Sequence, residues 1–237
     1  MWIDLHMHEK TYSKDSFLSL EEIVALGRAR GLDAVCITDH DDIGLREKAE
    51  CYAKQVGFPI FVGYEFYSLE GDIVAFGVPE VPKERIHAQT FLDYVKSCGG
   101  IAIAAHPFRN NRRGLEENLL QVRGLDALEA LNGSTLPDAG NRAFAYAKRL
   151  GLQTVGASDC HVRAKVGICA TYFPKPVETM AAFLDAFRTQ RLAPAIYRNG
   201  RYEIMDRQEA PMGMLPEPER LQDKIEALGA PLPAAGA

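Results

Sequence analysis

Short apolar runs, each followed by an amphipathic stretch, recur along the chain and limit the folds that it can adopt. A strand, a helix and another strand in regular alternation are typical of parallel strands with right-handed crossovers, so the pattern predicts an α/β barrel or an open wound sheet. A further strand or hairpin arm is expected at Asp72–Val78. The main predicted strands are Trp2–His6, Ala34–Thr38, Ile60–Gly63, Ile101–Ala105, Ala127–Leu131 and Thr154–Ala157.

The segments between these runs carry signals for the start and end of helices. Ser19 and Glu22 form a Ser-x-x-Glu capping box, and Gly31 is expected to end the helix that follows. The segment Gly140–Leu150 has two cations in its last turn and is followed by a glycine. Two more helices are predicted at Thr90–Ser97 and Glu178–Gln190.

Length and composition favour a single cytoplasmic domain. A chain of 237 residues, 47% of them hydrophobic, suits one large α/β domain with a substantial core. The net charge of −5 argues against a protein that coats long nucleic acid. No signal peptide and no apolar run of about 20 residues is visible, so no membrane span is expected. The five cysteines are scattered without a C-x-x-C pair, which indicates reduced thiols.

Five of the six histidines lie at or just after the C-terminal end of a predicted strand: His6, His8, His40, His106 and His161. A lone histidine of this kind is more often an ordinary hydrogen-bonded one, but barrels and wound sheets place their chemistry at these strand ends, so the set is expected to converge. The motifs His-x-His at residues 6–8 and Asp-x-His at residues 159–161 point two donors to one side of an extended chain, as a chelating pair requires. Met7 and Cys160 should then point away and pack.

Carboxylates accompany these histidines. Asp39 and Asp41 flank His40, and Glu65 follows a predicted strand between two aromatic residues. A helix-cap role is the simpler interpretation for Asp41 or Asp42, but less so for Glu65. Mixed imidazole and carboxylate donors favour Zn²⁺, Mn²⁺ or Fe²⁺ over Ca²⁺ or Mg²⁺. Because these donors are too many for one tetrahedral ion, the sequence predicts two or three ions.

In chain order, these motifs resemble the PHP (polymerase and histidinol phosphatase) superfamily. The likeness covers about residues 1–200 and rests on Asp-Leu-His6-Met-His8, Thr-Asp-His40-Asp, Gly-Tyr-Glu65, Ala-His106-Pro and Ser-Asp159-Cys-His161. It implies a distorted (β/α)7, TIM-barrel-like fold that holds two or three metal ions and hydrolyses phosphate esters. The metal ligands that it implies are His6, His8, Asp15, His40, Glu65, His106, Asp159 and His161.

The same resemblance suggests how the chain is divided. Residues 1–205 are expected to form one PHP metal-dependent hydrolase domain, in which residues 140–173 resemble the PHP-associated C-terminal region of short stand-alone members. Residues 206–237 are rich in proline and alanine and are expected to form a partly disordered tail, with room for a short helix at Glu217–Leu228.

One position departs from the resemblance. Many relatives carry a histidine ligand in a Gly-His element after the glutamate, where this chain has Gly71-Asp72-Ile73. Either Asp72 ligates a metal ion in place of that histidine, or the metal position is weakened or lost. Asp15 matches an element that supplies a ligand in many relatives, although it lies further from His8 than is usual there.

The predicted site suits hydrolysis of a phosphoester by a metal-bound hydroxide. A divalent ion lowers the pKa of a bound water from about 15.7 to roughly 7, and neighbouring ions neutralise the charge that develops on phosphate. His40 or His161, when not bound to metal, is expected to protonate the leaving group. Arg109 and Asn132 are the candidates for substrate contacts, with a solvated basic loop and a plain Asn-Gly turn as the alternatives. Lys165 could also face the site.

The substrate follows from the sequence only as a class. A small phosphomonoester, a nucleotide or a short oligonucleotide fits the site, whereas a membrane or a long duplex is not expected as a partner. One alternative is an amidohydrolase-type enzyme that acts on a non-phosphate substrate, although the metal-bridging lysine often found in such enzymes is not evident. The other is a non-catalytic regulatory domain that binds metal. The sequence leaves the native metal and the oligomeric state open.

Overall fold

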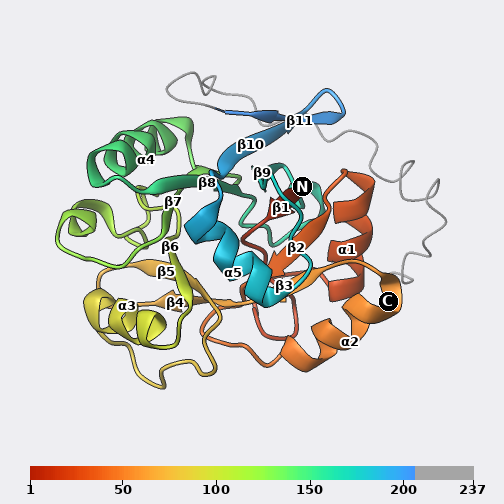
Figure 1. The fold of residues 1–237 in the computed structure, drawn as a ribbon, viewed down its shortest axis with the longest axis horizontal. Coiled ribbons are helices and arrows are strands. Elements are labelled where there is room, and N and C mark those ends of the chain that lie inside the picture. Colours follow the sequence, from red (N-terminus) through yellow and green to blue (C-terminus); the bar gives the residue numbers. More distant parts are fainter. Residues whose placement is uncertain (206–237) are drawn as a thin grey trace.

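The apolar runs form strands, but these strands divide between two sheets in the computed structural model, which describes residues 1–205 (Figure 1). The first sheet contains, in spatial order, β11 (Arg201–Ile204), β10 (Ala193–Arg198), β9 (Cys169–Tyr172), β1 (Trp2–Asp4), β2 (Ala34–Ile37) and β3 (Ile60–Val62). Strands β1, β2 and β3 are parallel, as the strand–helix alternation predicted. Strands β9, β10 and β11 pair antiparallel, which that alternation did not predict.

The second sheet combines a parallel half with an antiparallel half. In spatial order it contains β4 (Tyr64–Tyr67), β5 (Asp72–Phe76), β6 (Ile101–Ala104), β7 (Ala127–Asn132) and β8 (Gln153–Ala157). Strands β6, β7 and β8 are parallel, whereas β5 is antiparallel to both of its neighbours. The predicted extra strand is therefore β5, and it forms a hairpin with β4.

The prediction of a single closed barrel is wrong, because the strands form two separate sheets. The hydrogen-bonded pairing between neighbouring strands is interrupted at two places. The chain is extended on both sides of Gly63, but β3 pairs with β2, whereas β4 pairs with β5. A Cβ atom on Gly63 would come within 2.3 Å of the Ala75 carbonyl oxygen, so only glycine fits this close approach. Near the C-terminal ends of the strands, an isolated bridge between His40 and Glu65 links the two sheets.

The second change of partner lies where β8 packs against β9. The Gly156 N–H donates to the Thr171 hydroxyl at 3.0 Å, and that hydroxyl donates to the Gly156 carbonyl at 2.8 Å. A side-chain hydroxyl therefore takes up backbone groups that would bond to a neighbouring strand in a closed barrel. An isolated bridge between Met7 and Cys160 links the two sheets on this side.

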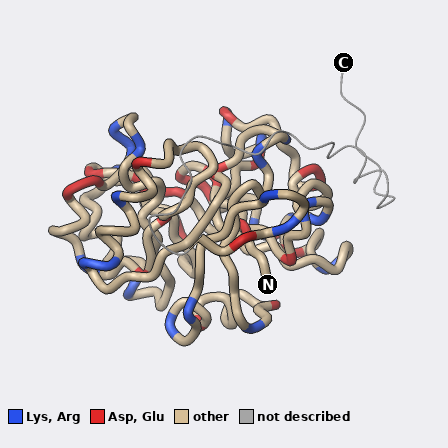
Figure 2. Tube along the Cα trace, turned by 90° about the horizontal axis from the view of Figure 1, so that it is seen from above, with Lys and Arg blue, Asp and Glu red and all other residues tan. Residues whose placement is uncertain are grey.

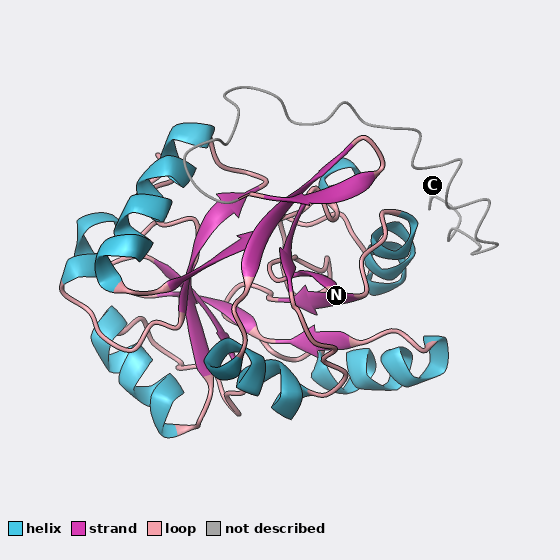
Figure 3. Cartoon of the chain, turned by 45° about the horizontal axis from the view of Figure 1, so that its top comes forward, coloured by secondary structure: helices cyan, strands magenta, loops and turns pink. Residues whose placement is uncertain are grey.

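Within residues 1–205, five α-helices lie outside the strands (Figure 3): α1 (Leu20–Ala29), α2 (Arg46–Val56), α3 (Ala88–Ser97), α4 (Pro137–Leu150) and α5 (Met180–Thr189). The predicted capping box is confirmed, because the Ser19 side chain accepts from the Glu22 N–H while Glu22 accepts from the Ser19 N–H. Helix α4 begins three residues before the predicted start and ends, as expected, at a left-handed Gly151. Helix α2 was not predicted, and Ala49 is its one buried residue.

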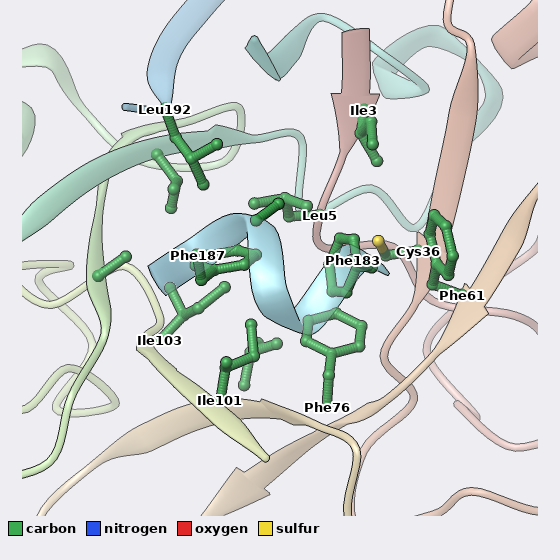
Figure 4. Close-up of a cluster of buried hydrophobic side chains, with 14 of the residues drawn as sticks. Ile3, Leu5, Cys36, Phe61, Phe76, Ile101, Ile103, Phe183, Phe187 and Leu192 are labelled. Atoms are coloured by element: carbon green, nitrogen blue, oxygen red, sulfur yellow. The ribbon is translucent and has the colours of Figure 1, made fainter. Parts of the chain in front are cut away.

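Helix α5 seals one end of the space between the sheets (Figure 4). The Phe183 ring stacks on Phe61 of the first sheet at a centroid distance of 4.6 Å and meets Phe76 of the second sheet at 5.0 Å. The helix lies at the starting ends of the parallel strands, since Arg188 donates to the carbonyl of Gly100, just before β6. We call this apolar cluster around Phe183 the closed end.

Two further expectations concern membrane spans and the tail. Across residues 1–205, no helix has both the length and the apolar character needed to cross a membrane. All five cysteines are free. The tail at 206–237, with its possible helix at Glu217–Leu228, lies outside the described residues.

Candidate metal centre

The five histidines that were expected to converge lie together at the end of the strands opposite α5, which we call the open end. Their ring centroids are 4.2 Å apart for His8 and His40, 4.2 Å for His8 and His161, and 5.8 Å for His6 and His106. The sixth histidine, His87, lies elsewhere and pairs with Glu70.

The two i, i+2 motifs contribute side chains from neighbouring chain segments. The segment after β1 and the segment after β8 run parallel, with Asp159 N–H donating to the His6 carbonyl and His8 N–H donating to the Cys160 carbonyl. Met7 and Cys160 are fully buried in an apolar cluster with α1, so they point away from the histidines. The alternation predicted for these motifs is therefore present.

Eight side chains provide three groups of possible metal donors, and His8 belongs to two of them. Within each group the donor atoms lie within 4.8 Å of one another. The groups are His6, His8 and Asp159; Glu65, Asp72 and His106; and His8, His40 and His161. Asp15 adjoins the third group, where its Oδ2 atom is 3.2 Å from His40 Nε2 and 3.3 Å from His161 Nε2. All eight residues predicted as ligands thus lie at the open end, together with Asp72.

The donor geometry of the first group fits a divalent ion. The Nε2 atoms of His6 and His8 are buried and lack a hydrogen-bond partner. They lie 3.7 and 3.4 Å from Asp159 Oδ1. Two ligands about 2.1 Å from a shared ion are roughly 3.0–3.5 Å apart, so these spacings suit common coordination better than direct hydrogen bonding. Burial lowers the pKa of His8 to about 4, which keeps its imidazole neutral at pH 7, as a metal ligand must be.

The opposite nitrogens of these two rings are held by protein groups. His6 Nδ1 donates to Glu129 Oε1 at 2.7 Å. His8 Nδ1 donates to the Ser13 hydroxyl at 3.2 Å, and that hydroxyl donates to Asp39 at 2.6 Å. Such contacts fix the ring orientation and leave Nε2 as the free electron-pair donor. Asp39 therefore acts through Ser13 rather than as one of the grouped donors.

Glu129 was missed by the sequence analysis. It is buried on β7, where it binds His6 Nδ1 and also accepts from the backbone N–H of His106 at 2.8 Å and from Asn132 at 2.8 Å. Its position in Ala-Leu-Glu-Ala-Leu, as a lone charge within an apolar strand, is the signal that could have identified it. Asp4 is a similar lone carboxylate on β1, and it accepts from the backbone N–H of Ser158 at 2.9 Å.

Asp72 stands where many members of the PHP superfamily carry a histidine ligand. Its Oδ2 atom lies 3.7 Å from His106 Nε2, and its buried Oδ1 atom has no hydrogen-bond partner. Arg113 donates from Nε to Asp72 Oδ2 at 2.6 Å, and its guanidinium lies over the Tyr67 ring. Burial and the charge of Glu65 raise the pKa of Asp72 to about 7, although Arg113 acts in the opposite direction.

The substrate-contact candidates lie beside Asp159. Arg109 Nη2 donates to both Asp159 and Asn132, and its Nε donates to the Thr135 hydroxyl at 3.1 Å. Arg109 and Asn132 are thus brought together at the rim of the donor cluster. Burial disfavours the charged form of Asp159, but interactions with His6 and His8 outweigh it and hold the pKa of Asp159 below its ordinary value. Arg112, by contrast, is exposed.

Backbone strain accompanies this site. Asp41, His106 and Asp159 have positive φ angles of 49°, 29° and 49°, in a region that side-chain-bearing residues rarely adopt. Residues are held in such conformations where the surrounding structure fixes them, which is common at functional sites. Asp41 accepts from the Tyr67 N–H and so joins the loop after β2 to β4 rather than capping a helix.

The open end combines buried acidic groups with an accessible cleft. Figure 2 shows acidic positions within the body of the fold as well as on its surface. Asp4, Glu65, Asp72, Glu129 and Asp159 are all at most 3% exposed. A cleft of about 350 Å³ reaches the donors and is lined by Asp15, His40, Asp41, Glu65, Asp72, His106, Arg109, Asn111, Arg113, Asp159 and His161. A small anion in this cleft would meet both the donor groups and the two arginines.

Known proteins resemble this chain in sequence or in fold. An uncharacterised protein of Methanocaldococcus jannaschii, MJ1587, is 26% identical over 141 residues, which cover 56% of this chain and 82% of that protein. A Bifidobacterium adolescentis protein, provisionally classed as a metal-dependent phosphoesterase, superposes with a TM-score of 0.58 at 19% identity, over 68% of this chain and 88% of that one. An amidohydrolase of Chromobacterium violaceum, solved with bound sulfate and no metal, superposes with a TM-score of 0.60 at 18% identity, over 78% and 96%.

These two structural likenesses concern the fold alone. The family matches are more specific. Residues 137–192 match the PHP-associated family, and residues 4–140 match the PHP domain family. The second match covers more than half of the chain and contains the motifs from His6 to His106. The chain therefore belongs to the PHP domain family.

Proposed function

We propose that this protein hydrolyses phosphate esters with two or three divalent ions, Zn²⁺, Mn²⁺ or Fe²⁺, held at the open end. The observation that carries the proposal is the junction of Asp159 with Arg109, because one carboxylate faces two buried histidine nitrogens on one side and a guanidinium on the other. Metal donors and an anion-binding side chain thus share one cleft. The name of the Bifidobacterium protein supports the same class of reaction.

Each donor group would hold one ion, with Glu65 placed to be shared. Its Oε1 atom is 3.5 Å from His6 Nε2, and its Oε2 atom is 3.7 Å from His8 Nε2. Oε1 is also 2.8 Å from His106 Nε2, so the carboxylate touches the first and second groups. When bound, such ions make a strong nucleophile available from water at neutral pH and offset negative charge on the phosphoryl oxygens.

Arg109 would bind the phosphate of the substrate. In the described part of the chain, Nε and Nη2 of Arg109 make hydrogen bonds, while Nη1 makes none. The side chain is 20% exposed and lines the cleft. A guanidinium held in this way presents N–H groups to an oxyanion without first having to be ordered.

His40 and His161 are the candidates for protonating the leaving group. Their side chains are 30% and 25% exposed, whereas those of His6 and His8 are fully buried. Burial lowers the pKa of His40, but the carboxylates of Glu65 and Asp15 outweigh burial and raise it to about 9. This imidazole would therefore carry a proton at pH 7 whenever it is not bound to metal, as a general acid requires.

The proposal is tested by replacing donors and measuring metal and turnover together. His8→Ala and Asp159→Ala should each remove bound metal and nearly all hydrolysis of a panel of phosphomonoesters and phosphodiesters, because the nucleophile depends on the ions. His87→Ala is the matched control, since this histidine lies outside the site. Elemental analysis and kcat/KM on the same samples measure both effects. Full activity of the His8 and Asp159 variants would contradict the proposal.

An amidohydrolase-type activity on a non-phosphate substrate is the second candidate, favoured by the fold shared with the Chromobacterium amidohydrolase. Arg109 separates the two. Arg109→Ala should keep the metal content and lower kcat/KM for phosphoesters. The loss corresponds to about 2–3 kcal/mol of transition-state stabilisation, as expected when a charged hydrogen bond is removed. An unchanged kcat/KM for the best phosphoester, together with turnover of amides, would favour the second candidate.

A further inference from the structure

A second and larger cavity opens beside the metal centre. Its volume is about 560 Å³, and it lies between the end of β7, the start of α4 and β10. His106, Glu129 and Asn132 line it, and these residues also contact the donors or Arg109. Binding cavities for whole organic molecules are commonly roughly 300–1,000 Å³, so this one can take a body much larger than a phosphate.

One wall of this cavity is mainly apolar. Phe108, Leu131, Ile196 and Met205 line the cavity, together with Leu136 at the start of α4. Leu136 is the N-cap of α4 and is 75% exposed, so a ligand in the cavity can cover its side chain. These side chains would gain contact area from an apolar ring, but not from an inorganic ion.

Two cations also line this cavity. Lys165 Nζ donates to the Ser134 hydroxyl at 2.9 Å, and Ser134 in turn donates to the Asp159 carbonyl at 3.0 Å, so Lys165 lies on the side of the metal centre. Arg198 ends β10. Within residues 1–205, neither side chain forms an ion pair with a carboxylate, in contrast to Arg113, which is neutralised by Asp72. A cation without a counter-charge in a partly apolar cavity favours an anionic ligand group.

We infer that this cavity binds the leaving group of the substrate, and that this leaving group carries an apolar ring and an anionic group of its own, besides the phosphate that is cleaved. The inference rests on the proposed function for the position of the scissile phosphate. Arg109 would hold that phosphate, the apolar wall would bind the ring, and Lys165 and Arg198 would bind the second anion.

Matched synthetic esters test the second anion. The probes are 4-carboxyphenyl phosphate and its neutral analogue 4-carbamoylphenyl phosphate, together with the same pair built on biphenyl for a longer reach. The wild-type protein should prefer the carboxylate in at least one pair. Arg198→Gln or Lys165→Gln should reduce that preference, the ratio of the two kcat/KM values, by about tenfold, the equivalent of one charged hydrogen bond. The two esters differ in intrinsic reactivity, but this difference cancels when the ratio is compared between the wild type and a variant, because both proteins are measured on the same two esters.

Arg201→Gln is the control for the loss of a positive charge, because Arg201 lies on β11 and pairs with Glu203 outside the cavity. It should leave the ratio unchanged. Leu136→Ala tests the apolar wall and should reduce the preference for phenyl phosphate over methyl phosphate. The inference is overturned if both carboxylate-to-carbamoyl ratios are near one in the wild type, or if the Arg198 and Lys165 variants keep the wild-type ratio.

Failure of the proposed function would give a different result. If the metal-loaded protein cleaves none of these esters, the hydrolytic proposal fails. The cavity is then tested by calorimetry, which measures the dissociation constants of the carboxylate and carbamoyl members of each pair. A preference for the carboxylate that depends on Arg198 would still support the binding site. Equal dissociation constants for both members of each pair would reject it.

Discussion

The two ends of the space between the sheets are built from opposite chemistry. At the closed end, Phe183 of α5 packs against aromatic side chains of both sheets. At the open end, buried carboxylates and imidazoles of both sheets face one another, and Arg109 and Arg113 offset only part of the negative charge. Apolar burial stabilises the first end without any cofactor, whereas the second gains most from bound cations. Stability and metal binding should therefore be separable by mutation.

The largest effect is expected at the closed end. Phe183→Ala should lower the free energy of unfolding by about 3–5 kcal/mol, because it leaves a cavity where two sheets and a helix meet. Phe17→Ala is the control, since Phe17 is 75% exposed and its loss should change stability by less than about 0.5 kcal/mol. Urea unfolding of both variants measures the difference. The folded fraction of the Phe183 variant should still bind metal to the wild-type stoichiometry, and loss of that binding would show that the ends are coupled.

The next largest effect is expected at the open end, where bound metal should raise the free energy of unfolding rather than lower it. Zn²⁺ or Mn²⁺ at about 100 times its dissociation constant should raise the free energy of unfolding by about 2.7 kcal/mol for one site. His8→Ala should abolish most of this gain because His8 belongs to two donor groups, whereas His87→Ala should retain it. Thermal or urea unfolding with and without a chelator measures the gain. Equal stabilisation of the wild type and the His8 variant would mean that the ions bind elsewhere.

A smaller effect separates two neighbouring arginines at the open end. Arg113→Gln should lower the stability of the metal-free protein by about 1 kcal/mol, because it leaves the buried Asp72 carboxylate without its hydrogen-bond partner, an effect reduced by the 32% exposure of Arg113. Arg112→Gln should have almost no effect, since Arg112 is exposed. Chelator-treated samples in urea measure both. An equal loss of stability in the two variants would imply a general effect of removing positive charge, and not the loss of the hydrogen bond between Arg113 and Asp72.

Sequence reasoning located the donors better than it described the sheets. The period of the apolar runs and the i, i+2 spacing are local properties, so the strand ends and the side-chain directions of residues 6–8 and 159–161 could be derived from them. The break in the barrel depends on contacts between distant segments, such as the Thr171 hydroxyl on Gly156. Helix α2 was missed because it has no side-chain cap and buries little. Glu129 was missed because its role appears only when β7 of one sheet meets His6, which follows β1 of the other sheet.

The order of the elements along the chain has a consequence for biosynthesis. The donors extend from His6 to His161, and α5, which seals the closed end, is not complete until Thr189. In a chain still on the ribosome, Phe61 of β3 and Phe76 of β5 therefore lack their packing partner Phe183 until nearly 190 residues have emerged. No shorter nascent segment contains the full donor set together with its apolar seal. The nascent chain must consequently avoid aggregation during most of its translation, before either end can be completed.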